Sequence, residues 1–278
     1  MVSILVIIAA ALAAAFLLGL LKEEARGTAY AVTIAALAVM AGVSAGWVWA
    51  FADPGATAVD VYTAGTAPPF AINLRMGRPE AALSLLVTLT GLLSALYLRD
   101  TLLGLGRRAM AVVLVSVMAL CGIILTRDIF NLFVFFELSA IATGGLILLS
   151  DDARALAAGF KYLIVSQVIS VLLLIGIIFA YHATGTLNID GMAAASLSLR
   201  TGGSLAFFLI FIADATELKP FPANGWALDI YESAHPAFSA VFSAAAGAAF
   251  LFATDKLLDI GGAAWLPDWP VPASAPAR

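Results

Sequence analysis

Ile129-Phe-Asn-Leu-Phe-Val-Phe-Phe-Glu137-Leu-Ser-Ala-Ile-Ala-Thr-Gly-Gly-Leu-Ile-Leu-Leu149 is an apolar run with a single ionisable side chain, Glu137. A helix that crosses the hydrocarbon core of a bilayer needs about 17–25 such residues, so this run is long enough to span it. Similar runs lie on both sides of it along the chain, at 1–21, 28–51, 80–98, 109–126, 156–181, 204–221 and 236–254. The sequence therefore predicts an all-α fold, a polytopic transmembrane bundle of about eight helices.

The composition of the whole chain favours lipid as its main solvent. Of the 278 residues, 63% are hydrophobic and 12% are charged, whereas soluble domains carry about 25% charged residues. The net charge of -4 comes without a basic patch, which argues against a nucleic-acid partner. Cys121 is the only cysteine and the histidines are two, so we expect no disulfide framework, no metal site and no cofactor.

We expect one transmembrane domain over residues 1–261, followed by a Pro- and Trp-rich interfacial tail at 262–278. The first apolar run lacks the basic n-region of a signal peptide, so it is predicted to be retained as a helix. The longest connection covers 52–79. Its stretch at 70–74 is predicted to form one side of a short hairpin outside the bilayer.

Basic residues in the loops predict the orientation, because cytoplasmic loops carry an excess of lysine and arginine. Seven belong to the loops after the first, third and fifth runs or to the start of the sixth: Lys22, Arg26, Arg99, Arg107, Arg108, Arg154 and Lys161. Four belong to the loops after the second, fourth and sixth runs: Arg75, Arg78, Arg127 and Arg200. The first set is expected to be cytoplasmic, which places both termini outside.

Four ionisable side chains are predicted to lie within the membrane: Glu137, Asp214, Glu217 and Lys219. On insertion scales each costs about 2.5–3.5 kcal/mol at the centre of a bilayer, or about 10 kcal/mol together if unpaired. These groups must therefore be paired, hydrated or used. For Glu137 an ion-binding role is favoured over a structural ion pair. For Glu217 and Asp214, which share a helix face, extension of the ion pathway and local balance of the Lys219 charge remain equally open.

Lys219 is predicted to lie where the seventh helix is broken. Pro220, Pro222 and Gly225 follow it closely, and a proline both removes a backbone donor and pushes the preceding residue out of the α region. Broken helices at membrane depth are tolerated beside protein or water and mark transport sites. Lys219 is therefore a candidate proton-relaying group, with a lysine that snorkels from a helix end as the alternative.

The remaining charged or titratable candidates lie near helix ends. Lys161 is a candidate for ion translocation, with an interfacial lysine as the alternative. For His182 and His235 an interfacial or capping role is favoured over a proton shuttle. Asp255 and Lys256 are predicted to close the eighth helix at the interface. Phosphate loops, nucleophile elbows and metal-ligand spacings are absent from the sequence, which argues against redox chemistry in this chain alone.

Two motifs resemble the antiporter-like membrane subunits shared by Mrp-type cation/proton antiporters, respiratory complex I and membrane-bound hydrogenases. Arg127-Asp128-Ile-Phe-Asn131-Leu-Phe-Val-Phe-Phe-Glu137 resembles the fifth helix of that family. Lys219-Pro-Phe-Pro222-Ala-Asn224-Gly-Trp226-Ala-Leu-Asp229 resembles its broken seventh helix. Together these two motifs are specific.

Two further stretches extend the resemblance over nearly the whole chain. Lys161-Tyr162-Leu163 with Thr184-Gly185-Thr186-Leu187-Asn188 looks like the sixth helix and the loop after it, and Thr66-Ala-Pro68-Pro69-Phe70-Ala-Ile72 looks like the segment before the third helix. The likeness is greatest to the D-type subunit of Mrp antiporters and its hydrogenase counterparts.

The resemblance implies a fifth-helix glutamate and a seventh-helix lysine whose charge pair gates proton or sodium movement. Glu137 matches the glutamate, but the family's lysine falls at Glu217 when counted back from Pro222. Lys219 is thus displaced by two positions, about 200° around an ideal helix. The family's eighth-helix lysine falls near Ala248, where this chain has no charge. The chain corresponds to the first half of such a subunit, and another chain is expected to supply the second, inverted repeat.

We therefore expect a membrane subunit of a complex-I-like or Mrp-type assembly, not catalytic alone, in the inner membrane of a bacterium or archaeon. It would take part in proton or sodium translocation through its intramembrane charges, with other membrane subunits and the lipid bilayer as its partners. The alternative from another class is a non-conducting structural subunit that docks a redox or partner module. A stand-alone transporter for a small solute is less favoured, because the chain corresponds to a single repeat.

Overall fold

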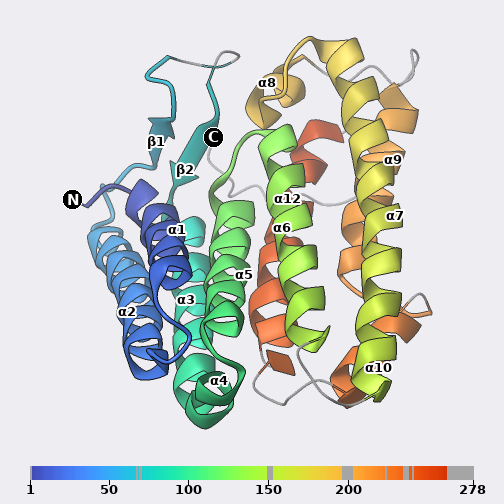
Figure 1. Ribbon diagram of the computed structural model, residues 1–278. Helices are drawn as coiled ribbons and strands as arrows, with labels where there is room; N and C mark the ends of the chain where they lie inside the picture. Colours follow the sequence, from blue (N-terminus) through green and yellow to red (C-terminus); the bar gives the residue numbers. More distant parts are fainter. Residues whose placement is uncertain are drawn as a thin grey trace.

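The protein is a bundle of helices that run roughly alongside one another, with a β-hairpin at one end (Figure 1). The computed structural model describes residues 2–66, 68, 71–148, 153–195, 203–222, 224–233, 238–239 and 241–261. His235 and the predicted interfacial tail at 262–278 lie outside these residues, so the boundary between domain and tail remains a prediction.

The first part of the chain forms helices around the hairpin strands. The elements are α1 (Leu5–Leu20), α2 (Arg26–Ala50), β1 (Val59–Tyr62), β2 (Asn73–Met76), α3 (Arg78–Tyr97), α4 (Arg99–Leu105) and α5 (Arg107–Leu125). The second part is helical in the residues that are described. Its elements are α6 (Ile129–Leu148), α7 (Ala153–Thr184), α8 (Ile189–Ala194), α9 (Gly203–Glu217), α10 (Gly225–Ser233), the π-helical turn η1 (Val241–Ala246) and α12 (Gly247–Gly261).

Five helices of the described part are long and apolar enough to cross a bilayer: α2, α3, α5, α6 and α7. They coincide with the predicted runs at 28–51, 80–98, 109–126, 129–149 and 156–181. α7 has 32 residues, or about 48 Å at 1.5 Å per residue, and so exceeds the roughly 30 Å of a hydrocarbon core. α1 is apolar but shorter, with 16 residues.

α5 is the central helix of the bundle. It packs against α1, α2, α3, α6 and α12, and 78% of its most apolar window is buried. A helix that is apolar on every side is expected in such a position. The outer helices instead expose large apolar side chains, for example Phe16 (70%), Leu93 (62%) and Phe160 (64%). An exposed surface of this kind suits contact with lipid tails.

The hairpin is attached to the ends of α5, α6 and α7. β1 and β2 pair antiparallel from Val59↔Met76 to Tyr62↔Asn73, so β2 overlaps the end of the stretch predicted as a hairpin side. The N–H of Arg127 donates to the carbonyl of Asn73 (2.8 Å), and the N–H of Ile189 donates to the carbonyl of Arg127 (2.9 Å). The hairpin, the α5–α6 connection and the loop after α7 therefore form one hydrogen-bonded layer.

Arginine side chains cap helix ends at the opposite end of the bundle. Arg107 donates to the carbonyls of Leu18 (3.1 Å) and Gly19 (2.6 Å), and Arg26 donates to the carbonyl of Leu103 (3.1 Å). A positive charge at the C-terminal end of a helix is favourable because the last carbonyls lack helical partners and the helix dipole is negative there. These arginines come from the set with the larger basic count.

The last two predicted runs differ from the observed elements. In the run at 204–221, α9 ends at Glu217 and α10 begins at Gly225, because Pro220 and Pro222 cannot continue a helix. The run at 236–254 contains η1 and α12, but α12 continues to Gly261. The prediction that Lys256 closes this helix is therefore wrong. The helix continues since the apolar positions Leu257 and Ile260 remain buried in the core.

Candidate ion-translocation site

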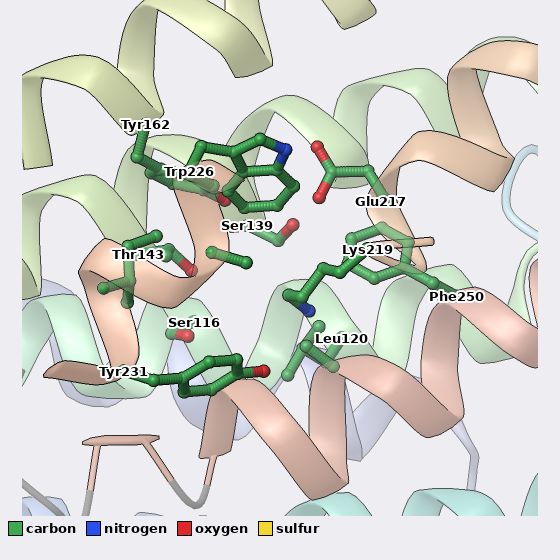
Figure 2. Close-up of a pocket in the computed structure, with 13 residues that line it drawn as sticks. Ser116, Leu120, Ser139, Thr143, Tyr162, Glu217, Lys219, Trp226, Tyr231 and Phe250 are labelled. Atoms are coloured by element: carbon green, nitrogen blue, oxygen red, sulfur yellow. The ribbon is translucent and has the colours of Figure 1, made fainter. Parts of the chain in front are cut away.

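A small cavity of about 20 Å³ lies among α5, α6, α7, α10 and α12, next to the end of α9. This volume holds about one water molecule. Figure 2 shows the lining, in which polar groups and aromatic rings alternate around the space. The lining residues are Ser116, Leu120, Ser139, Thr143, Tyr162, Glu217, Lys219, Trp226, Ala227, Ile230, Tyr231, Ala246 and Phe250.

Local backbone geometry brings Glu217 and Lys219 to the same cavity. α9 ends at Glu217, and Lys219 adopts a left-handed conformation with φ of 57°, which costs a lysine about 1–2 kcal/mol. The offset of 200° between positions 217 and 219 applies only within a regular helix, and Lys219 lies beyond the helix. Figure 2 shows both side chains directed into the cavity region.

Glu217 is buried, with 5% of its surface exposed, and it interacts electrostatically with Lys219. Burying a lone carboxylate is costly, and a nearby ammonium offsets part of that cost. The indole Nε1 of Trp226 also lines the cavity and has no hydrogen-bond partner among the described residues. An unpaired donor next to a water-sized space is a suitable partner for one bound water.

Glu137 lies on α6 but not in the lining of this cavity. Its carboxylate accepts a hydrogen bond of 2.9 Å from Nε2 of Gln167 on α7. Ser139, two residues along α6, does line the cavity. The phenol of Tyr162 lines it as well and interacts electrostatically with both Glu217 and Glu137. Tyr162 is thus the group that lies between the two carboxylates.

Asp214 is completely buried on α9, one helical turn before Glu217. Its Oδ2 accepts a hydrogen bond of 2.5 Å from the hydroxyl of Thr254 on α12. Its Oδ1 has no partner among the described residues. Asp214 therefore adds a second buried carboxylate on the same helix face as Glu217 and joins α9 to α12.

Lys161 lies away from the cavity, on the surface between α7 and α10. Its Nζ forms an ion pair of 2.5 Å with Oδ2 of Asp229, and the two side chains are 56% and 45% exposed. His182 is exposed in the last turn of α7. Among the described residues, no group of three or more His, Cys, Asp or Glu side chains is placed to hold a metal ion.

Lys256 is a buried charge whose position the sequence analysis missed. It is 1% exposed, and its Nζ donates to the carbonyls of Ile123 (2.6 Å), Ile124 (3.1 Å) and Thr126 (2.9 Å) at the end of α5. The ammonium also lies 5.3 Å from the ring centroid of Phe252. The spacing of Ala253, Lys256 and Ile260 along one helix face could have indicated this position. Asp255, by contrast, is exposed.

A charged cluster joins the hairpin to the helix ends near Lys256. Asp190 forms ion pairs with Arg127 and, at 3.4 Å, with Arg75, which also binds Asp60 at 3.0 Å. Burial alone would raise the pKa of Asp190, but the hydrogen bond from Arg127 and the positive charges of Arg127, Arg75 and Lys256 outweigh it and lower that pKa below its usual value. Asp190 is therefore ionised at neutral pH.

The apolar bundle with buried carboxylates and lysines defines an integral membrane protein that keeps charged groups in its core. Residues 126–266, half of the chain, match the family described as NADH:quinone oxidoreductase/Mrp antiporter, TM, and the chain belongs to this family. The resemblance drawn from the sequence motifs is thereby confirmed. The matched stretch includes both Glu137 and Lys219.

Two curated relatives and one solved structure illustrate the similarity. The N-type subunit of the NADH-quinone oxidoreductase of Desulforudis audaxviator is 31% identical over 176 residues, which are 61% of this chain and 35% of the relative. The D-type subunit of a probable K(+)/H(+) antiporter of Rhizobium meliloti is 31% identical over 188 residues, which are 66% of this chain and 35% of the relative.

The solved structure is a chain of the membrane-bound sulfane sulfur reductase, an archaeal respiratory membrane complex. It superposes with a TM-score of 0.80 at 29% identity and covers 91% of this chain and 52% of that chain. The protein thus matches about a third of each curated relative and about half of the solved chain. This similarity supports a multisubunit membrane complex as its setting.

Proposed function

We propose that this chain is an ion-translocating subunit of a larger membrane complex of the Mrp or complex I type, and that it moves protons or Na⁺. The observation that carries the proposal is the buried cavity shared by Glu217 and Lys219 at the end of α9. Ionisable groups inside a membrane protein are functional by default because their burial is costly. The printed function of a K(+)/H(+) antiporter among its relatives supports the same direction.

In this proposal, α9 and α10 are two halves of one broken membrane span, and the whole chain has about eight spans. The attraction between Glu217 and Lys219 is strong where water is scarce. Protonation of Glu217 removes one charge of this pair and releases Lys219, and loss of that proton restores the pair. Glu137, close to Tyr162, would respond to each change. A water molecule in the cavity would carry the proton between groups.

The setting of the subunit is part of the same proposal. The membrane is the inner membrane of a bacterium or archaeon, with both termini outside, which puts the hairpin on the outer side. Another chain supplies the second repeat, since the present one matches about half of the solved reductase chain.

One observation favours the alternative of a non-conducting structural subunit. Lys161 pairs with Asp229, and Lys256 has an acceptor for each of its three N–H donors. Satisfied charges of this kind can hold helices together without moving ions. A structural subunit would dock a redox or partner module through the hairpin or the helix ends.

Ion transport by the purified complex in proteoliposomes separates the two functions. We expect Glu217→Gln, Lys219→Ala and Glu137→Gln each to reduce transport by roughly a hundredfold, the scale on which a positioned proton-transfer group contributes. Glu24→Gln, an exposed carboxylate in the α1–α2 loop, is the matched control. Native electrophoresis checks that the complex is intact. Unchanged transport by the three variants in an intact complex would favour the structural subunit.

A further inference from the structure

The unassigned buried charges of α9 and α12 lie between the cavity and the hairpin end of the bundle. Lys256 donates to the last carbonyls of α5 at that end. Asp214 lies between Lys256 and the cavity, because it binds Thr254 on α12 and precedes Glu217 by one turn of α9. Neither residue lines the cavity itself.

Asp214 has the features of a proton acceptor and donor. One carboxylate oxygen accepts from Thr254, while the other is buried without a partner among the described residues. Asp214 interacts electrostatically with Glu217 on its own helix and with Lys256 on α12. A purely structural carboxylate would be expected to have both oxygens satisfied, because an unpaired buried polar atom costs about 1–3 kcal/mol.

Lys256 connects Asp214 to the charged cluster at the hairpin. The groups that face its ammonium electrostatically are Arg127, Glu80, Asp214 and Asp190. Of these, the side chain of Asp190 is 40% exposed and reaches solvent. A line of titratable groups therefore runs from Glu217 through Asp214 and Lys256 to a surface carboxylate.

We infer that Asp214 and Lys256 form a second proton-transfer pair, which connects the cavity of Glu217 and Lys219 with the hairpin-side surface of the protein. This inference rests on the proposed function and names one access route to the site. The hydroxyl of Thr254, which bonds Asp214, holds the carboxylate in place next to α12.

Each step moves one proton and no electrons. The O–H bond of protonated Glu217 breaks and an O–H bond forms on the free oxygen of Asp214. The proton then passes to the lone pair of neutral Lys256, which becomes the ammonium seen here. Release of that proton to water beside Asp190 returns Lys256 to the amine. The ammonium holds three carbonyls of α5, so its deprotonation leaves one of them without a donor and loosens the α5–α12 contact.

The test compares Lys256→Arg and Asp214→Asn in the intact complex. Arginine keeps the positive charge and the donors but does not deprotonate, and asparagine keeps the shape of Asp214 but does not ionise. We expect each to reduce transport by roughly a hundredfold, with Asp214→Glu restoring part of it. If Lys256→Arg and Asp214→Asn transport like wild type while Glu137→Gln and Glu217→Gln do not, the proposed function stands and the access route is overturned. If none of the four reduces transport, both are overturned.

Infrared spectroscopy gives a readout that does not depend on transport or on the fit of arginine. In a pH titration of the complex, we expect a carbonyl band of a protonated carboxylic acid that disappears in Asp214→Asn and persists in Glu24→Gln. Absence of any such difference would show that Asp214 never binds a proton and would overturn the inference, even if its variant failed to assemble. A structural role alone would not produce this band.

Discussion

Gly122 is the point of closest approach between α5 and α6, and its replacement by alanine tests the packing that positions the cavity. A Cβ at this position would lie 2.4 Å from two carbon atoms of the Phe135 ring. Ordinary carbon contacts are about 3.5–4.0 Å, so the ring or the helix must move by about 1 Å. Phe135 is 8% exposed and is enclosed by its neighbours, which leaves the ring little room to turn away.

The expected cost follows from two opposing effects. Overpacking of a tight core costs about 1–3 kcal/mol, and alanine gains up to about 1 kcal/mol over glycine in helix propensity. We therefore expect Gly122→Ala to destabilise the protein by about 1–2 kcal/mol. Ser116 and Leu120 on α5 and Ser139 on α6 line the cavity, so the shift should also reduce transport.

Thermal unfolding of the purified complex in detergent, at one fixed heating rate, measures this effect. The matched control is Gly42→Ala, a glycine within α2 whose added Cβ would have no atom within 4 Å. We expect Gly42→Ala to leave the unfolding temperature unchanged or to raise it, and Gly122→Ala to lower it. Equal unfolding temperatures for the two variants would refute the close approach of α5 and α6 at this position.

Three further predictions concern other parts of the molecule. Because its folded pKa is lowered, Asp190 stabilises the fold above its ordinary pKa of about 3.9, and this contribution is lost as the pH falls through the folded value; acid unfolding should begin at the same pH or higher in wild type than in Asp190→Asn, which is less stable at neutral pH. Lys161→Met should change the unfolding free energy by less than about 1 kcal/mol, as expected for an exposed ion pair, and a larger loss in the same thermal assay would contradict the exposure of this pair. Cys121 is buried, so a maleimide reagent should label it only after denaturation, and rapid labelling of the native complex would disprove that burial.

The apolar runs could be predicted from the sequence because lipid imposes a minimum length on each span. The end of α9 follows from local chemistry as well, since Pro220 and Pro222 exclude a continuous helix whatever surrounds them. The hairpin at β1 and β2 was only partly located, because a stretch with turn residues does not indicate which positions pair.

Partners of the charged groups could not be predicted, because they depend on how separate helices pack. The hydrogen bond between Glu137 and Gln167 joins residues 30 positions apart, and nothing in either segment specifies the other. Lys256 was misplaced for a different reason. Hydropathy ended the span at 254, whereas the helix continues because its buried face extends to Ile260. The side to which Lys219 turns depends on one left-handed residue after the helix, which sequence spacing does not reveal.

The backbone layer at the hairpin end makes the two ends of the bundle mechanically unequal. Main-chain hydrogen bonds join Asn73, Arg127 and Ile189 there, whereas long arginine side chains tie helix ends together at the other end. Backbone ties deform less than flexible side chains, so the hairpin end acts as an anchor and the helices can tilt more freely at the far end. A neighbouring subunit that pressed on the hairpin would therefore shift α5, α6 and α7 as one body, while one that pressed on the far end would displace single helices.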